Sequence, residues 1–201
     1  KCSVNNHYPE GSREPLNYLL GLMNSVPSDD VHKKISALLD MEAWGKFAAF
    51  ESLARTFHYN DSHNWRMYYD PAKGKFIPIV WDPVAWVSEW LGKGGEVGQQ
   101  DIMPSRLHTF LYQNSDFIRA RQKAIFDFFD AGLDQQFLKK VTSTINSMEL
   151  VVPHDVNTIP VSQKKVLRNV RSMQSAVEKA FGDVKLGYIS TKVSPQYEHR
   201  E

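Results

Sequence analysis

The sequence predicts a mostly helical α+β fold in which one β-hairpin is inserted between helices. Over most of the chain, apolar residues recur at the three- and four-residue spacing of amphipathic helices. Between residues 64 and 81 this pattern gives way to two short runs rich in aromatic and β-branched residues. The segment between the two runs contains Pro71 and Gly74, which are typical of a tight turn. We therefore expect strands over residues 64–69 and 75–81.

Three helices are expected before the hairpin. Ser12 can cap the first, and a short second helix follows over residues 31–39. Asp40 can cap the third, and Glu42 lies in its first turn, where the helix dipole favours an acidic side chain. The apolar stripe of this third helix is mostly aromatic and consists of Trp44, Phe47, Phe50, Leu53, Ala54 and Phe57. We interpret the stripe as core, which would fix the position of the polar segment after it.

Four helices are expected after the hairpin. The first spans residues 106–112. The other three are bounded by residues that commonly start or stop helices. These are Ser115, Asp134 and Ser162 as caps, and Gly132, Pro153 and Gly182 as stops.

A length of 201 residues suffices for one domain with a substantial core. We expect a leading segment and first helix over residues 1–30, the main domain over 31–187, and a polar tail over 188–201. Because the chain begins at Lys1, we expect it to be part of a longer protein.

Composition argues against several classes of protein. The 24 basic and 23 acidic side chains give a net charge of +1, so no global field points to a nucleic acid partner. No apolar run reaches the roughly 18 residues that a membrane span needs, so we expect none. Cys2 is the one cysteine and cannot form an internal disulfide or a cysteine zinc site.

Two catalytic motifs can also be tested against the sequence. The glycine-rich stretch GKGGEVG, residues 92–98, lacks the Lys-Ser or Lys-Thr pair that ends a Walker loop. A Gly-x-Ser-x-Gly elbow is absent as well, which argues against a serine hydrolase. We therefore interpret residues 92–98 as a surface loop, with a phosphate cradle as the alternative.

A polar cluster lies at the outer end of the hairpin, and Asp82 follows the second strand. The cluster consists of His58, Asn60, Asp61, His63 and Asn64. Because a hairpin brings its outer ends together, these groups can converge on one cleft. Asp61, Asn64 and Asp82 are hard oxygen donors of the kind that bind magnesium together with phosphates. The pattern therefore favours a metal-phosphate site.

Two alternatives remain open for the same residues. Asp61 and Asn64 are common turn residues, and Asp82-Pro83 can also form a simple turn. His58 and His63 with Asp61 could instead bind a transition metal, although their spacing matches no recognised ligand pattern.

The order of these segments resembles the CotH family of spore-coat-type protein kinases. The resemblance covers roughly residues 35 to 180. It is carried by a helix start, a polar loop with the first strand, a second strand ending in Trp-Asp, a later helix pair and a Pro-containing connection. In this chain these are residues 38–44 (LLDMEAW), 61–68 (DSHNWRMY), 73–82 (KGKFIPIVWD), 107–129 (LHTFLYQNSDFIRARQKAIFDFF) and 152–155 (VPHD).

The resemblance implies an atypical kinase that transfers phosphate from ATP to protein serines, with a fold like the C-terminal lobe of a kinase. Asp61 would then be the catalytic aspartate, and Asn64 and Asp82 would bind Mg²⁺. The implied partners are a protein substrate or a surface protein, and the implied location is outside the cell or at a spore surface.

The chain departs from the family pattern in three ways. The family leaves more residues between the loop aspartate and the asparagine than lie between Asp61 and Asn64. It carries a second acid two residues after Trp-Asp, where this chain has Val84. It also has an N-terminal lobe, which the 60 residues before Asp61 are too few and too helical to form, so we expect that lobe on an upstream segment. A non-catalytic surface or coat binding module is therefore the alternative, with a metal-dependent hydrolase as a third class.

Overall fold

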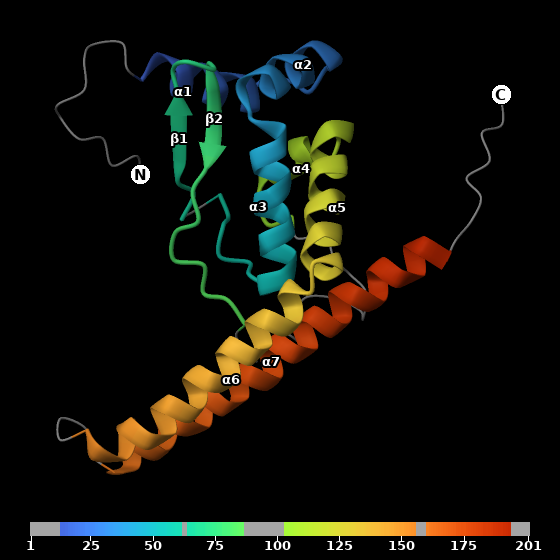
Figure 1. The fold of residues 1–201 in the computed structure, drawn as a ribbon. Coiled ribbons are helices and arrows are strands. Elements are labelled where there is room, and N and C mark those ends of the chain that lie inside the picture. The colour runs from blue at the N-terminus through green and yellow to red at the C-terminus, as the bar shows by residue number, and fades with distance from the viewer. Residues whose placement is uncertain (1–12, 62–63, 87–102, 156–159, 194–201) are drawn as a thin grey trace. The chain divides into compact units, whose positions relative to one another are not determined.

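The computed structural model describes residues 13–61, 64–86, 103–155 and 160–193 (Figure 1). Within these ranges the predicted mostly helical α+β fold with one hairpin is confirmed. The elements are α1 (Glu14–Met23), α2 (Asp29–Leu38), α3 (Met41–Ala54), β1 (Met67–Asp70), β2 (Lys75–Pro78), α4 (Arg106–Leu111), α5 (Ser115–Asp130), α6 (Leu133–Val151), η1 (Val152–His154) and α7 (Pro160–Val193).

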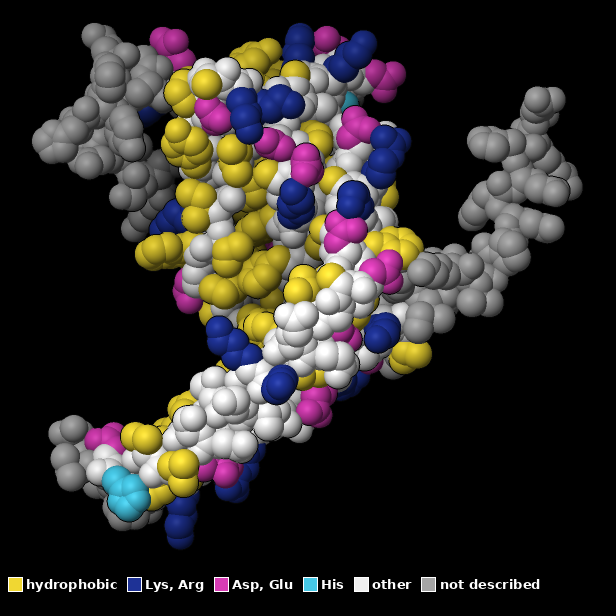
Figure 2. Space-filling view, viewed as in Figure 1, with side chains coloured by type: hydrophobic (Ala, Val, Ile, Leu, Met, Phe, Trp, Pro, Cys, Tyr) yellow, Lys and Arg dark blue, Asp and Glu magenta, His cyan; other side chains and the backbone are white. Residues whose placement is uncertain are grey.

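The chain divides into two compact units. Unit 1 comprises residues 1–51, 57–83 and 102–125, and unit 2 comprises residues 52–56, 84–101 and 126–201. Unit 1 therefore holds the first helices, the hairpin and α4, whereas unit 2 holds α6 and α7. On the face drawn in Figure 2, basic and acidic side chains are interspersed over unit 1, as a net charge near zero leads us to expect.

The hairpin is shorter than the sequence predicts. Strands β1 and β2 pair antiparallel, with Tyr69 opposite Phe76. Beyond Pro78, which has no N–H to donate, the pairing is continued by one bond from Ile79 N to Arg66 O at 2.9 Å. The predicted turn is confirmed, because the Asp70 carboxylate accepts a hydrogen bond from Ala72 N at 3.0 Å.

The core of unit 1 forms where the hairpin packs against the first three helices. The predicted aromatic stripe of α3 supplies Trp44, which is 0% exposed, and Phe47, which is 5% exposed. Trp65 and Tyr59, from the segment before β1, pack against Phe47 with ring centroids 5.9 Å and 4.9 Å away. Aromatic contacts of this kind hold Tyr59 and Trp65 against α3.

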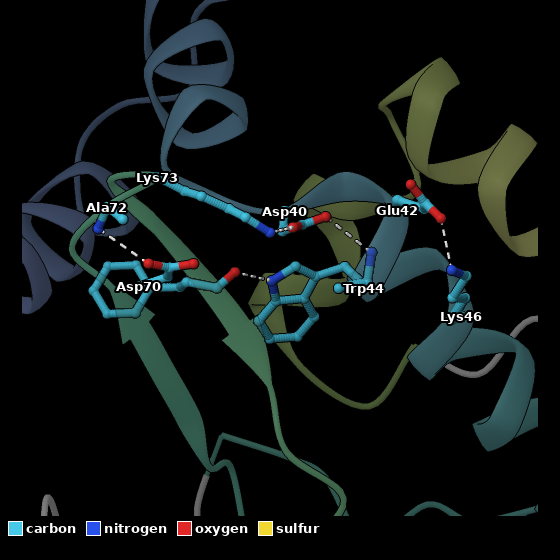
Figure 3. Close-up of polar contacts among 9 residues, drawn as sticks. Asp40, Glu42, Trp44, Lys46, Asp70, Ala72 and Lys73 are labelled. Atoms are coloured by element: carbon cyan, nitrogen blue, oxygen red, sulfur yellow. Dashed lines mark hydrogen bonds and ion pairs between the residues drawn. The ribbon is translucent and has the colours of Figure 1, made fainter.

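One polar contact region attaches the hairpin to the start of α3 (Figure 3). The predicted cap is confirmed, because Asp40 Oδ1 accepts from Ala43 N at 3.1 Å. Asp40 also lies 3.8 Å from the Lys73 ammonium in the hairpin turn. Trp44 Nε1 donates to Phe76 O at 3.0 Å, so a buried indole N–H joins α3 to β2.

Helices α3 and α5 approach closely at Gly45. A Cβ atom at this position would lie 2.6 Å from Ala120 Cβ and 2.7 Å from Arg121 N. Since neither of those atoms can move aside without moving α5, the position accepts only glycine.

Unit 2 is organised by α6 and α7, which lie side by side as an antiparallel pair (Figure 1). Phe181 on α7 contacts Phe128 and Phe137, with ring centroids 5.2 Å and 5.7 Å away. Trp86 also belongs to this unit: its indole N–H donates to Leu53 O at 3.0 Å, and its ring lies 5.2 Å from that of Phe137.

Several predicted helix boundaries are wrong. Asn114, not Ser115, caps α5, because its side-chain oxygen accepts from Asp116 N at 2.9 Å and Phe117 N at 3.0 Å. Asp134, the predicted cap of α6, is instead buried in its first turn, 3.5 Å from Lys185 Nζ. Gly132, with a φ of +64°, follows the end of α5 at Asp130, as predicted for a stop, and is also the N-cap of α6.

The last helix is also longer than expected. It begins at Pro160, before Ser162, and continues through Gly182 to Val193. The neighbours of Gly182, Phe181 and Val184, are 4% and 0% exposed, so packing outweighs the local preference of glycine to end a helix. None of the described helices is both long enough and apolar enough to cross a membrane.

Candidate functional site

Asn64 and Asp82 share an uncommon backbone conformation. Their φ angles are +68° and +45°, in the left-handed region that most side chains avoid. Asn and Asp tolerate this region best among residues with a side chain, because their short polar groups can bond locally. Such conformations cluster at sites where geometry matters for function, and Arg55, Val84 and Trp86 have positive φ angles as well.

His58 joins these two residues. Its Nδ1 atom lies 2.7 Å from the carbonyl oxygen of Asp82 and 3.9 Å from the Asp82 carboxylate. The Asn64 amide nitrogen lies 2.8 Å from Nδ1 and 3.1 Å from Nε2 of the same ring. The structure therefore brings Asn64 and Asp82 together around one imidazole, as the hairpin argument predicts for the ends of the two strands.

Two contacts compete for Nδ1 of His58. A carbonyl oxygen can only accept, so a bond to Asp82 O at 2.7 Å needs a proton on Nδ1, whereas a bond from Asn64 Nδ2 at 2.8 Å needs a lone pair there. With the proton on Nδ1, Asn64 Nδ2 can donate only to Nε2, at 3.1 Å. In either tautomer the Asn64 amide keeps its oxygen for another partner.

The Asp82 carboxylate is accessible. Its side chain is 60% exposed, whereas that of His58 is 20% exposed. The arrangement therefore combines a half-buried orienting ring with an exposed acid.

Asp61 has a different contact. Its two carboxylate oxygens lie 3.2 Å from the backbone nitrogen of Arg106, the first residue of α4. The Arg106 guanidinium in turn donates to Met23 O at 2.7 Å and to Asn24 Oδ1 at 3.2 Å. Asp61 thus attaches its loop to the start of a helix, while the carboxylate itself stays at the surface.

Tyr59 lies beneath this region. Burial raises the pKa of Tyr59 to about 12, and the negative charges of Glu51 and Asp82 add to that effect. A backbone hydrogen bond involving Trp81 opposes it. The phenol therefore stays protonated at neutral pH and adds no negative charge beside Asp82.

A second polar group, not predicted from the sequence, is buried inside unit 1. His108 Nε2 lies 3.1 Å from Glu51 Oε1, and His108 Nδ1 lies 2.7 Å from Ser105 Oγ. Glu51 and His108 are each 1% exposed, and Arg121 is 2% exposed. Burial raises the pKa of Glu51, against the opposing pull of His108 and Arg121.

One feature of the sequence indicates a buried polar contact in α3. Glu51 follows Phe47 by four residues, so it falls on the buried stripe of α3, where an unpaired acid would be costly. A charged residue on such a stripe calls for a buried partner, but the spacing does not identify His108 as that partner.

The metal alternatives can be compared with this geometry. Among the described residues, no group of three or more His, Cys, Asp and Glu side chains could hold a metal ion. His63 lies outside the described residues, as does the stretch 92–98 that was considered as a phosphate cradle. The transition-metal alternative includes His63 and so extends beyond the described residues, whereas the oxygen donors of Asn64 and Asp82 lie within them.

Comparisons with known protein families, with characterised proteins and with solved structures find no match to this chain.

Proposed function

We propose that unit 1 carries a magnesium-nucleotide site and that the chain is a CotH-like atypical protein kinase, or the catalytic half of one. In this proposal Asn64 and Asp82 hold Mg²⁺, and Asp61 orients the acceptor hydroxyl of a protein serine. The observation that supports the proposal most is the convergence of Asn64 and Asp82 on His58, at 3.1 Å and 2.7 Å.

The donor set fits magnesium. Mg²⁺ takes one or two protein oxygen ligands and fills its other positions with water and substrate phosphates. An exposed carboxylate at Asp82 and the remaining amide oxygen of Asn64 are hard donors of this kind. When bound, Mg²⁺ supplies positive charge that offsets the charge of the phosphates.

The protein groups around these donors have separable roles. His58 orients Asn64 through its side chain and Asp82 through its backbone. A carboxylate has about four lone-pair positions, and the Arg106 N–H uses only part of that capacity at Asp61. Asp61 can therefore accept a hydrogen bond from a substrate hydroxyl while it stays attached to α4.

A non-catalytic surface or coat binding module is the second candidate. Two observations favour it. Val84 stands where the resemblance implies a second acid, and the Asp61 carboxylate already serves the start of α4. In that case the polar groups would keep the fold of unit 1 without holding a nucleotide.

A thermal-shift titration with Mg-ATP tests the first candidate. A ligand that binds only the folded state stabilises it by about 2.7 kcal/mol at roughly a hundredfold excess over Kd, so the unfolding temperature should rise with the logarithm of the Mg-ATP concentration above Kd. Asp82→Asn is the informative variant, since Asn keeps the shape and tolerates the φ of +45° but removes the charge. Asp116→Asn, an exposed acid in the first turn of α5, is the matched control.

We expect a shift that grows with Mg-ATP concentration in wild type and in D116N, and its loss in D82N. A shift only in a longer natural form of the protein would identify this chain as the catalytic half of a split site. No shift in either form would favour the binding module.

Transfer of phosphate to a protein serine tests Asp61 separately. Asp61→Asn can still accept from Arg106 N, so the fold should be kept. We expect D61N to bind Mg-ATP normally and to lose transfer, and retained transfer would remove Asp61 from the mechanism.

A further inference from the structure

The end of the α6–α7 hairpin exposes large apolar side chains. Leu150 and Val151, the last two residues of α6, are 74% and 65% exposed, and Val166 on α7 is 38% exposed. Single exposed apolar residues are ordinary, but neighbouring ones on adjoining helices form a patch that is costly to leave in water.

Two polar contacts fix which part of α7 lies beside this patch. Arg171 Nε donates to Glu149 Oε1 at 2.6 Å, and Gln163 Nε2 donates to Asp155 O at 3.1 Å. Residues 164–168 therefore run alongside residues 150–155. We call the resulting surface the hairpin end, after the α6–α7 helical hairpin and not the β-hairpin. We define it as Leu150, Val151, Lys164, Lys165, Val166 and Arg168.

Basic side chains outnumber acidic ones around the hairpin end, where Lys164, Lys165, Arg168 and Arg171 stand against Glu149 and Asp155. No Asp or Glu occurs between Asp155 and Glu178, a stretch that carries four of the 24 Lys and Arg residues. The other 20 stand against 23 Asp and Glu. Arg171 pairs with Glu149, but within the part of the chain that the structure describes no ion pair is recorded for Lys164, Lys165 or Arg168.

We propose that the hairpin end docks on an anionic membrane surface. Leu150 and Val151 enter the headgroup region, while Lys164, Lys165 and Arg168 contact acidic lipid headgroups. Figure 2 shows hydrophobic and basic side chains at this end of α6 and α7, together with acidic ones. Adjacent exposed apolar and cationic side chains match a lipid interface, which takes both without a shaped pocket.

Co-sedimentation with lipid vesicles tests the proposal on the full 201-residue chain. The two vesicle types are phosphatidylcholine alone and an equimolar mixture of phosphatidylcholine and phosphatidylserine. We expect binding to the mixed vesicles only, and weaker binding as salt shortens the reach of the charges.

Two double variants separate the two contributions. Each cation near an anionic surface is worth roughly fivefold in affinity, so K164E/K165E should weaken binding by more than about 25-fold. L150S/V151S keeps all charges and should also weaken binding, since its effect is on insertion. Both replace exposed side chains, so neither should disturb folding.

Matched controls lie on the same helix pair. Lys139 and Lys140 are exposed on α6, about 16 Å along the helix from Leu150, so K139E/K140E makes the same charge change away from the hairpin end. Leu133→Ser is the apolar control at the opposite end of α6. We expect both controls to bind mixed vesicles nearly as well as wild type.

Three results would overturn the proposal. The first is no binding of wild type to the mixed vesicles. The second is an equal loss in K139E/K140E and K164E/K165E, which would indicate a general charge effect. The third is full binding by L150S/V151S, which would indicate a polyanion contact without insertion, such as an acidic protein.

Discussion

His108 Nε2 lies 3.1 Å from Glu51 Oε1, and both side chains are 1% exposed. A buried pair of an acid and a histidine can add net stability to the fold. Alternatively it adds none, and stability falls only when one partner is removed and the other stays buried alone. The raised pKa of Glu51 favours the second explanation, since burial penalises its charged form more than His108 and Arg121 favour it.

Substitutions at Glu51 should therefore have unequal effects. We expect Glu51→Ala to lower the free energy of unfolding by about 3–5 kcal/mol, because it leaves buried His108 and Arg121 without the carboxylate. Glu51→Gln still accepts from His108 and should cost much less. Urea denaturation at pH 7 measures both, with Glu42→Gln as an exposed control, and equal losses in E51A and E51Q would show that the charge itself is required.

The same pKa shift predicts a dependence on pH. A carboxyl whose folded pKa is raised binds its proton more tightly in the folded state. Its stabilising contribution is therefore full below the unfolded value of 4.5 and is lost as pH rises through the folded pKa. We expect the difference in unfolding free energy between E51Q and wild type to shift in favour of E51Q as pH rises from 4.5 toward neutrality. A constant difference over that range would contradict the assignment.

Asp40 offers a test of the contact region between α3 and the hairpin. Asp40→Ala removes the cap of α3 and should cost about 1 kcal/mol. Asp40→Asn keeps the cap and loses only the ion pair with Lys73, whose side chain is 58% exposed, so its effect should be small. Thermal unfolding compares the two, and similar losses in D40A and D40N would assign the stability to the ion pair instead.

Gly45 and Gly21 form a matched pair of helical glycines. A Cβ at Gly45 meets Phe117 O at 2.9 Å as well as atoms of Ala120 and Arg121, so Gly45→Ala should destabilise by about 2–3 kcal/mol. Gly21 in α1 has nothing within 4 Å, and Gly21→Ala should stabilise by about 0.5–1 kcal/mol. Chemical denaturation gives both values, and a neutral G45A would mean that α3 and α5 can separate slightly at no cost.

Local patterns predicted the elements of this fold better than their ends. The cap at Asp40 and the turn after Asp70 were predictable because each depends on side chains and backbone a few residues apart. Helix α7 continues through Gly182 because Phe181 and Val184 are buried. The sequence around Gly182 does not reveal that burial.

The candidate site shows the same division. The meeting of Asn64 and His58 with Asp82 follows from hairpin geometry, but the sequence does not reveal that the His58 ring lies between the other two. Glu51 and His108 are 57 residues apart, and neither short spacing nor residue type links them. Contacts between distant segments depend on how helices pack, so they appear only in the folded chain.

His58 gives the sharpest test of the proposed site. We expect His58→Ala to weaken Mg-ATP binding by about 10–100-fold, because groups that orient metal ligands typically contribute that much. The loss of unfolding free energy should be only about 1 kcal/mol for the lost hydrogen bonds. Calorimetric titration measures affinity, and thermal unfolding measures stability.

Rescue distinguishes orientation from mere folding at His58. A glutamine can donate to Asp82 O with its amide nitrogen and accept from Asn64 with its oxygen, as the neutral imidazole does. We therefore expect His58→Gln to recover much of the affinity that H58A loses, and His154→Ala, at an exposed histidine in η1, to leave it unchanged. If H58A instead binds Mg-ATP as tightly as wild type, the contacts of His58 only shape the loop, and Asn64 and Asp82 need no orienting ring.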